Sequence, residues 1–267
     1  MQRLDIVNAL TNLGRVRRAY LREKNALNLR ILGLIRSELG FVAGKDVDKA
    51  TEKSNKKIKT RSDKILAALL KRNPEKLKDE DREVYDYMVG IGTGFLIAMS
   101  ALLEAKDAIE QQMTAVGKKL PEAEWWASHL GLSYLGFALV ISDTGDLSRF
   151  TKESQLWKRM GLAVINGERQ RRVAGNPELA IEHGYNSDRR TTMWVIMDSF
   201  MRNRNKECYA DHPWMNLFRT YKANQLAQEG CIPAKAEERA KRRLSKRILR
   251  DLFIEWNKNT VVLKKAA

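Results

Sequence analysis

The chain has 267 residues, 49 Lys and Arg against 33 Asp and Glu, and a formal net charge of +16. That length holds one large or two modest domains with a sizeable core. Charged residues make up 31% and hydrophobic residues 43% of the chain, which excludes a disordered basic tail and indicates a folded basic protein. Such an excess of cations indicates a polyanionic partner, most often nucleic acid and less often an acidic membrane surface.

The cysteine content and the hydropathy pattern favour a cytoplasmic protein. Cys208 and Cys231 form no disulfide framework, which suits a reducing compartment. The first residues lack the apolar core of a signal peptide. The longest run without charge, residues 87–103, is just short of a bilayer span and contains three glycines. We expect a buried helix there and no membrane partner; the alternative is a membrane helix.

The first 80 residues form a predicted basic helical region. Residues 6–34 carry apolar side chains at a spacing of seven, with Leu10 and Ile31 between them, in the row Ile6, Leu13, Tyr20, Leu27 and Leu34. Five arginines crowd the same helix: Arg15, Arg17, Arg18, Arg22 and Arg30. They form either a solvated basic face or a stripe along a nucleic-acid backbone. A mixed-charge helix over 45–64 and a further helix over 65–72 should follow.

Residues 81–120 form a predicted coiled-coil-like helix. Two rows repeat at seven, namely Phe95, Leu102, Ile109 and Val116, and Met99, Met113 and Leu120. The glycines at 90, 92 and 94 predict a break or kink, since the run lacks the Lys and Ser or Thr of a phosphate-binding loop. The two heptad stretches predict an antiparallel coiled coil or a dimer seam, so we expect a homo-oligomer.

Residues 121–267 are predicted to form a helix-hairpin-helix domain, which makes the whole chain mostly α with one small β-hairpin. Residues 130–133, Leu-Gly-Leu-Ser, look like the hairpin of that module. Its glycines let the backbone approach a phosphate, whose charge then lies on helix N-terminal amides. Gly131, Ser133 and Gly136 are therefore candidate nucleic-acid contacts; the alternative is a plain buried helical turn.

Three further basic groups in this domain are candidate nucleic-acid contacts. Asn166-Gly167 favours a type I′ turn between strands at 163–165 and 168–173, whose second arm bears Arg169, Arg171 and Arg172. These arginines either probe a groove or merely solubilise the hairpin. A helix to about residue 205 should begin with Arg189 and Arg190 and bury Met193, Trp194, Met197, Phe200 and Met201. The last helix has Leu244, Ile248, Leu252 and Trp256 on one side and Arg239, Arg243, Lys246 and Arg250 on the other.

Several of these motifs together resemble a known domain. They are Gly-Asp-Leu-Ser-Arg-Phe at 145–150, Gln-Leu-Trp at 155–157 with Gly-Leu at 161–162, Gly-Tyr-Asn at 184–186, and residues 243–256. The domain is the C-terminal helix-hairpin-helix domain of insertion-sequence transposases that combine a RuvC-like DEDD nuclease domain with a serine-bearing domain and use a bridge RNA. The resemblance covers roughly residues 120–257 and implies a DNA-binding domain, with Arg149 of the first motif as a further candidate contact.

The chain departs from that family where the chemistry would be. The N-terminal half has no alternating strands to carry the four metal-binding acidic residues. Residues 163–186 contain no Ser, Thr or Cys, so Ser187 is the first hydroxyl available for the nucleophile, and its position suggests a helix N-cap instead. The sequence shows no cofactor motif, and the pair Cys208 and His212 is incomplete as a zinc site.

These observations predict a DNA-binding protein, with structured RNA as an alternative ligand. Its expected role is that of an accessory factor of a mobile element or phage that lacks the nuclease domain. One alternative is an active transposase that works with a separate nuclease subunit or through Ser187. Another alternative is a structural assembly protein whose basic faces bind nucleic acid incidentally.

Overall fold

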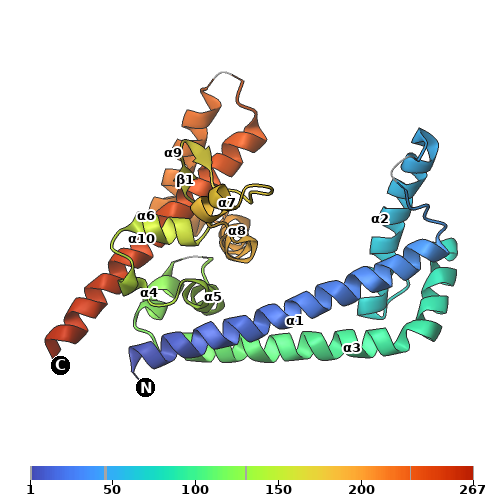
Figure 1. Ribbon diagram of the computed structural model, residues 1–267, viewed down its shortest axis with the longest axis horizontal. Coiled ribbons are helices and arrows are strands. Elements are labelled where there is room, and N and C mark those ends of the chain that lie inside the picture. Colours follow the sequence, from blue (N-terminus) through green and yellow to red (C-terminus); the bar gives the residue numbers. More distant parts are fainter. Residues whose placement is uncertain (1, 45–46, 130, 229, 267) are drawn as a thin grey trace. The chain divides into compact units, whose positions relative to one another are not determined.

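The computed structural model describes residues 2–44, 47–129, 131–228 and 230–266, and side chains up to residue 259. The predicted mostly α fold with one small β-hairpin is confirmed (Figure 1). The elements are α1 (Arg3–Glu38), α2 (Lys49–Lys71), α3 (Asp79–Gly117), α4 (Glu122–Ser128), α5 (Tyr134–Thr144), η1 (Leu147–Arg149), α6 (Glu153–Arg159), β1 (Val164–Ile165), β2 (Glu168–Arg169), α7 (Pro177–His183), α8 (Ser187–Arg202), η2 (Glu207–Tyr209), α9 (Pro213–Leu226) and α10 (Pro233–Ala266).

The chain forms two compact units. One unit contains residues 16–109, which we call the helical arm, and the other contains residues 1–15 together with 110–267, which we call the C-terminal unit. Both divisions fall within long helices, α1 and α3, whereas the sequence prediction placed its boundaries at residues 80 and 120.

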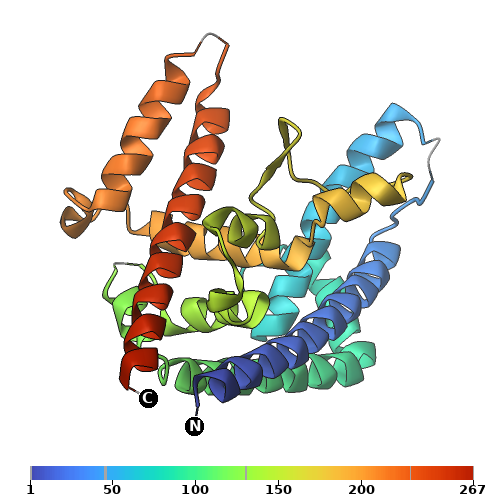
Figure 2. The ribbon, with the colours of Figure 1, turned by 60° about the vertical axis from the view of Figure 1, so that its left-hand side comes forward.

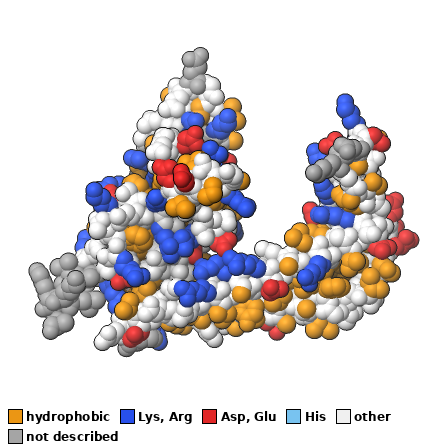
Figure 3. Space-filling view, viewed as in Figure 1, with side chains coloured by type: hydrophobic (Ala, Val, Ile, Leu, Met, Phe, Trp, Pro, Cys, Tyr) orange, Lys and Arg blue, Asp and Glu red, His pale blue; other side chains and the backbone are white. Residues whose placement is uncertain are grey.

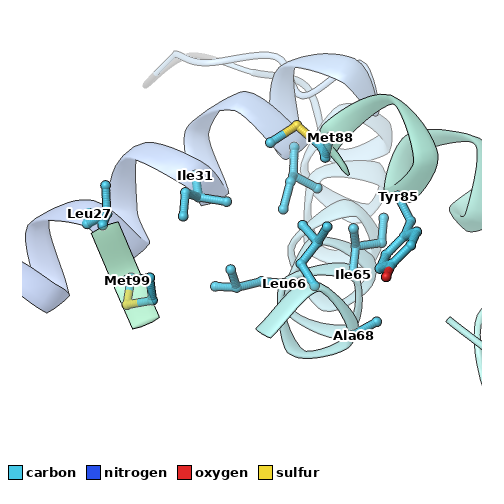
Figure 4. Packing of buried hydrophobic residues seen from close by; sticks show 10 residues of the cluster. Leu27, Ile31, Ile65, Leu66, Ala68, Tyr85, Met88 and Met99 are labelled. Atoms are coloured by element: carbon cyan, nitrogen blue, oxygen red, sulfur yellow. The ribbon is translucent and has the colours of Figure 1, made fainter. Parts of the chain in front are cut away.

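The helical arm is built around one apolar cluster to which three helices contribute. α1 supplies Leu27, Ile31 and Ile35, and α2 and α3 supply the remaining buried side chains (Figure 4). The predicted heptad row of α1 is correct at Leu27 but wrong at Leu34, which is 38% exposed. The buried apolar cluster of this unit is therefore formed by three helices instead of by a two-helix seam. The side chains from α2 and α3 are Ile65, Leu66, Ala68, Leu69, Tyr85, Met88 and Met99.

One helix break predicted in the arm is wrong, and of the break or kink predicted in α3 only a bend is present. The helices expected at 45–64 and 65–72 are the single helix α2, which begins after Asp48; residue 45 lies outside the described residues. The Asp48 carboxylate accepts a hydrogen bond from the Thr51 amide at 2.7 Å and so caps the helix. α3 likewise runs without a break through Gly90, Gly92 and Gly94. Its ribbon nevertheless bends in its first half (Figure 1), as helices do where glycines weaken the packing of successive turns.

The apolar run of α3 is more exposed than the sequence predicts. α3 is long and apolar enough to cross a membrane by length and composition, yet only 17% of its most apolar window is buried. Ile91 and Ile97 are 52% and 63% exposed, and Figure 3 shows hydrophobic side chains gathered over α3. The prediction of a buried helix is therefore wrong for most of this run, because α1 and α2 cover only one side of α3.

The C-terminal unit is assembled around α10. This helix packs against α9, α6, η1, α4 and α8 (Figure 1, Figure 2). Its buried stripe recurs mostly every four residues, which keeps the apolar side chains on one face of the helix. The stripe consists of Ala236, Ala240, Leu244, Ile248, Leu249, Leu252 and Trp256.

Polar contacts tie both ends of the chain into this unit. The fully buried carboxylate of Glu122 accepts hydrogen bonds from Arg3 at 2.6 Å and from Asn259 at 3.0 Å. The Arg3 guanidinium also lies 3.9 Å from the centre of a Trp256 ring. The indole N–H of Trp256 donates to Asp146 at 3.0 Å, which anchors the turn before η1 to α10.

An aromatic cluster joins α4 to the start of α9. The rings of His129 and Trp214 stack with centroids 4.4 Å apart, and the His212 ring lies 6.0 Å from His129. Nδ1 of His212 accepts the Trp214 amide hydrogen at 3.2 Å and so caps α9. Burial, and secondarily the nearby His129, lowers the pKa of His212.

Truncation of Ile65 should destabilise the helical arm. Ile65 is fully buried, so Ile65→Ala removes packed atoms and leaves a cavity, at a cost of about 2–5 kcal/mol in the free energy of unfolding. Leu70→Ala, on the same helix at a 39% exposed position, is the matched control and should cost far less. Urea denaturation followed by circular dichroism measures both, and equal costs would contradict the cluster.

Acid should destabilise the protein through His212. A lowered folded-state pKa means that the unfolded chain binds the proton more tightly, so stability is lost as pH falls through the unfolded value of about 6.5. His212→Asn retains a capping side chain and removes the titration. The melting temperature of this variant should depend less on pH between about 7 and 5.5 than that of the wild type. An unchanged pH dependence would contradict this account.

Candidate nucleic-acid interface

A cleft in the C-terminal unit gathers cationic side chains from three elements of the chain. Its volume is about 1040 Å³, and β1, β2, α8, α9 and α10 contribute to its walls. Two acidic side chains, Asp198 and Glu238, line it beside eight cationic ones. The cations are Arg169, Arg190, Lys235, Arg239, Lys241, Arg242, Arg243 and Lys246.

Most of these cations come from the face of α10 that is opposite its buried stripe. Arg239, Arg242, Arg243 and Lys246 are separated by three, one and three residues, so they share an arc of the helix. The buried stripe fixes the rotation of α10 and therefore directs this arc into the cleft. Arg169 of β2 and Arg190 of α8 face it from other elements.

The hairpin that carries Arg169 is tied to its neighbours by one buried amide. The side-chain nitrogen of Gln170 donates to the carbonyls of Lys158 at 3.0 Å and His183 at 2.6 Å. Its side-chain oxygen accepts the Ala163 amide hydrogen at 3.1 Å. This amide therefore joins the hairpin to α6 and α7 and holds Arg169 beside α8 and α10.

The cleft places like charges close enough to disturb one another. Burial, with Arg190 and Arg169 nearby, lowers the pKa of Arg242 to about 10. Burial and Arg169 also lower the pKa of Arg190, and burial with Arg242 and Arg243 lowers the pKa of Lys246. All three pKa values are lowered, which means that burial and the neighbouring cations disfavour the charged form of each side chain. An anion bound between them would offset this cost.

Contacts with neutral groups hold two of these cations in position. The Arg242 guanidinium donates to the carbonyls of Leu162 at 3.1 Å and Ala163 at 2.6 Å. The ammonium of Lys246 lies 5.1 Å from the centre of the Trp157 ring, whose N–H donates to the Lys246 carbonyl at 3.0 Å. These contacts fix the geometry without neutralising the charge. Lys241 differs, because Glu237 pairs with it at 3.0 Å.

The structure brings together five of the basic residues that the sequence singled out. Arg169, Arg190, Arg239, Arg243 and Lys246 line the cleft. Arg171 pairs with Glu168 at 3.2 Å, and Arg250 lies 3.9 Å from Glu153. The second strand is shorter than predicted and ends at Arg169, which leaves Arg171 and Arg172 beyond it. The cleft lining does not include five other predicted contacts, namely Arg149, Arg171, Arg172, Arg189 and Arg250.

The predicted hairpin residues have packing roles in the structure. Gly131 has φ +77°, and a Cβ there would lie 2.4 Å from the Tyr209 hydroxyl, so only glycine fits between α4 and α5. Ser133 caps α5 by accepting the Gly136 amide hydrogen at 3.0 Å, and Gly136 is buried beside Ile196. Leu130 of this motif lies outside the described residues. A phosphate contact at these positions stays a prediction.

Ser187 does not cap α8. Asn186 is the cap, because its side chain accepts the Arg189 amide hydrogen at 3.0 Å, and Ser187 is the first, exposed residue of the helix. The amide side chain of Asn186, one residue earlier, already satisfies the helix end. Capping therefore does not explain Ser187, and its assignment as a nucleophile stays a prediction.

Sequence reasoning missed two features of the cleft. Trp194 was expected in the core, but it is 63% exposed and lines the cleft. It lies one position after the buried Met193, about 100° around the helix, and so falls on the flank of the apolar face. Arg242 was also missed, although its spacing of three from Arg239 and four from Lys246 was the available signal.

Comparisons with models of protein families, with curated proteins and with solved structures found no match for this chain.

The cleft should bind small anions and gain stability from them. Phosphate at fixed ionic strength should raise the melting temperature of the wild type more than chloride does, because it relieves repulsion among the cleft cations. Arg190→Gln should reduce this increment. Lys258→Gln, which changes an exposed lysine outside the cleft that pairs with Glu255 at 3.3 Å, should retain it. If phosphate raised the melting temperature of both variants equally, it would bind outside the cleft.

Proposed function

We propose that this chain is a nucleic-acid-binding protein and that the cationic cleft is its site for the phosphate backbone. The observation that carries the proposal is the gathering of cationic side chains from β2, α8 and α10 around one cleft. Burial and neighbouring cations lower the pKa of Arg190, Arg242 and Lys246 there, which supports it. A folded protein that keeps several cations in mutual repulsion gains free energy when an anion enters between them.

A polyanion fits the cleft better than a single small anion does. The volume of about 1040 Å³ is at the upper end of the range of small-molecule pockets, about 300–1,000 Å³. The cations also come from β2, α8 and α10, so they are distributed along the walls instead of converging on one point. The net charge of the whole chain adds a long-range attraction for nucleic acid.

The resemblance to the transposase domain supports DNA as the ligand and structured RNA as the alternative. It also supports a role in a mobile element, for which we propose that of an accessory factor. Among the residues that the structure describes, no group of His, Cys, Asp and Glu side chains could hold a metal ion. The basic residues of the cleft fall within the range that the resemblance covers.

Binding to DNA should weaken steeply with salt. If the cleft neutralises about six phosphates, the logarithm of the binding constant should fall against the logarithm of salt concentration with a slope of about −5. Arg239→Gln with Arg243→Gln should reduce the magnitude of that slope by about two, one for each phosphate contact removed. Fluorescence anisotropy with labelled DNA over a series of salt concentrations measures the slope.

Lys258→Gln provides the control, because it removes one exposed positive charge outside the cleft and should leave the slope nearly unchanged. A wild-type slope near zero would contradict nucleic-acid binding. An equal reduction in the control and in the double variant would place the binding surface outside the cleft.

A further inference from the structure

We propose that the cleft takes an unpaired nucleic-acid strand and stacks a base on the ring of Trp194. This inference rests on the proposed function, since the cations must first bind the backbone. It adds the class of nucleic acid and the residue that recognises it.

Trp194 is placed as a stacking platform. Tryptophan is highly buried on average in folded proteins, but here it is 63% exposed. It stands on α8 one turn after Arg190 and one turn before Asp198, and all three residues line the cleft. The ring therefore lies on the same helical face as a cation with a lowered pKa.

Other flat groups accompany Trp194 along the cleft. Tyr185 and Tyr221 also line it, and the Arg243 guanidinium lies 5.7 Å from the centre of the Tyr221 ring. Cations that follow a backbone, interleaved with aromatic rings on which bases stack, are how proteins bind single strands with little sequence preference. In a duplex the base faces are covered by neighbouring base pairs, so an exposed ring can stack only on an unpaired base.

The acidic side chain beside Trp194 does not oppose this arrangement. The carboxylate of Asp198 is bound by the Arg202 guanidinium, which donates to it at 2.7 Å and 3.1 Å. This ion pair lies along α8 and offsets the negative charge next to the ring. The field around Trp194 is consequently set by Arg190 and the α10 cations.

The experiment compares three ligands of equal length and sequence at one salt concentration. They are a single DNA strand, the same strand with abasic sugars at its central positions, and the matching duplex. Wild type is measured against Trp194→Ala and Val195→Ala by fluorescence anisotropy. Val195 is the next residue of α8, is 47% exposed and is not among those that line the cleft, so it matches Trp194 in exposure but not in position.

We expect the wild type to bind the intact strand about 5- to 100-fold more tightly than the abasic strand. Trp194→Ala should abolish this difference, whereas Val195→Ala should keep it. Equal wild-type affinity for the intact and abasic strands would overturn the stacking role while leaving the phosphate site in place. Tighter binding of the duplex than of the single strand would overturn it as well. Failure to bind any of the three ligands would overturn both this inference and the proposed function.

Discussion

The packing of α10 is the interaction on which the C-terminal unit depends. A stripe of small and large apolar side chains, from Ala236 to Trp256, lies against five other elements and sets the rotation of the helix. Once that rotation is set, the opposite face directs Arg239, Arg242, Arg243 and Lys246 into the cleft. The hydrophobic contribution of burial thus holds in place charges that repel one another.

This arrangement distinguishes the cleft, as a proposed site, from an ordinary basic surface. On an open surface, arginine and lysine side chains separate into water and interact weakly. In the cleft, Arg242 is held by the carbonyls of Leu162 and Ala163, and Lys246 lies over Trp157. These contacts limit the side chains' freedom to separate, and no neutralising carboxylate accompanies them in the contacts described. Under the proposed function, the cost in folding free energy would become a source of binding free energy when phosphate enters.

Periodicity predicted much of this from the sequence, because the apolar and basic residues of α10 follow the helical repeat. It also located the hairpin, since Asn166-Gly167 favours the turn that forms, with Gly167 at φ +80°. Other features depend on tertiary contacts that periodicity does not contain. Trp194 is as apolar as its buried neighbour Met193, and only the placement of the surrounding elements exposes it. The helix break expected within α2 is absent because the buried Ile58 and Ile65 lie two helical turns apart and anchor one continuous helix.

The exposed apolar run of α3 is the other feature that periodicity could not predict. Hydropathy alone treats residues 87–103 as a buried segment, whereas the helical arm has only enough partners to cover Met88 and Met99 among its large side chains. The heptad row of α1 also differs from the prediction. Ile35 is buried instead of Leu34, because α2 joins the cluster. Three-helix packing is therefore what the pairwise heptad prediction missed.

Photochemical cross-linking tests the central claim, that the cleft is where nucleic acid binds, most directly. The full-length protein would be irradiated in complex with a single strand carrying photoreactive bases, and cross-linked peptides would be mapped by mass spectrometry. We predict that the cross-links concentrate on α8 at Trp194 and on the segment of α10 that contains Arg239 to Lys246. Cross-links confined to the helical arm, or spread evenly over the basic surface, would contradict the account.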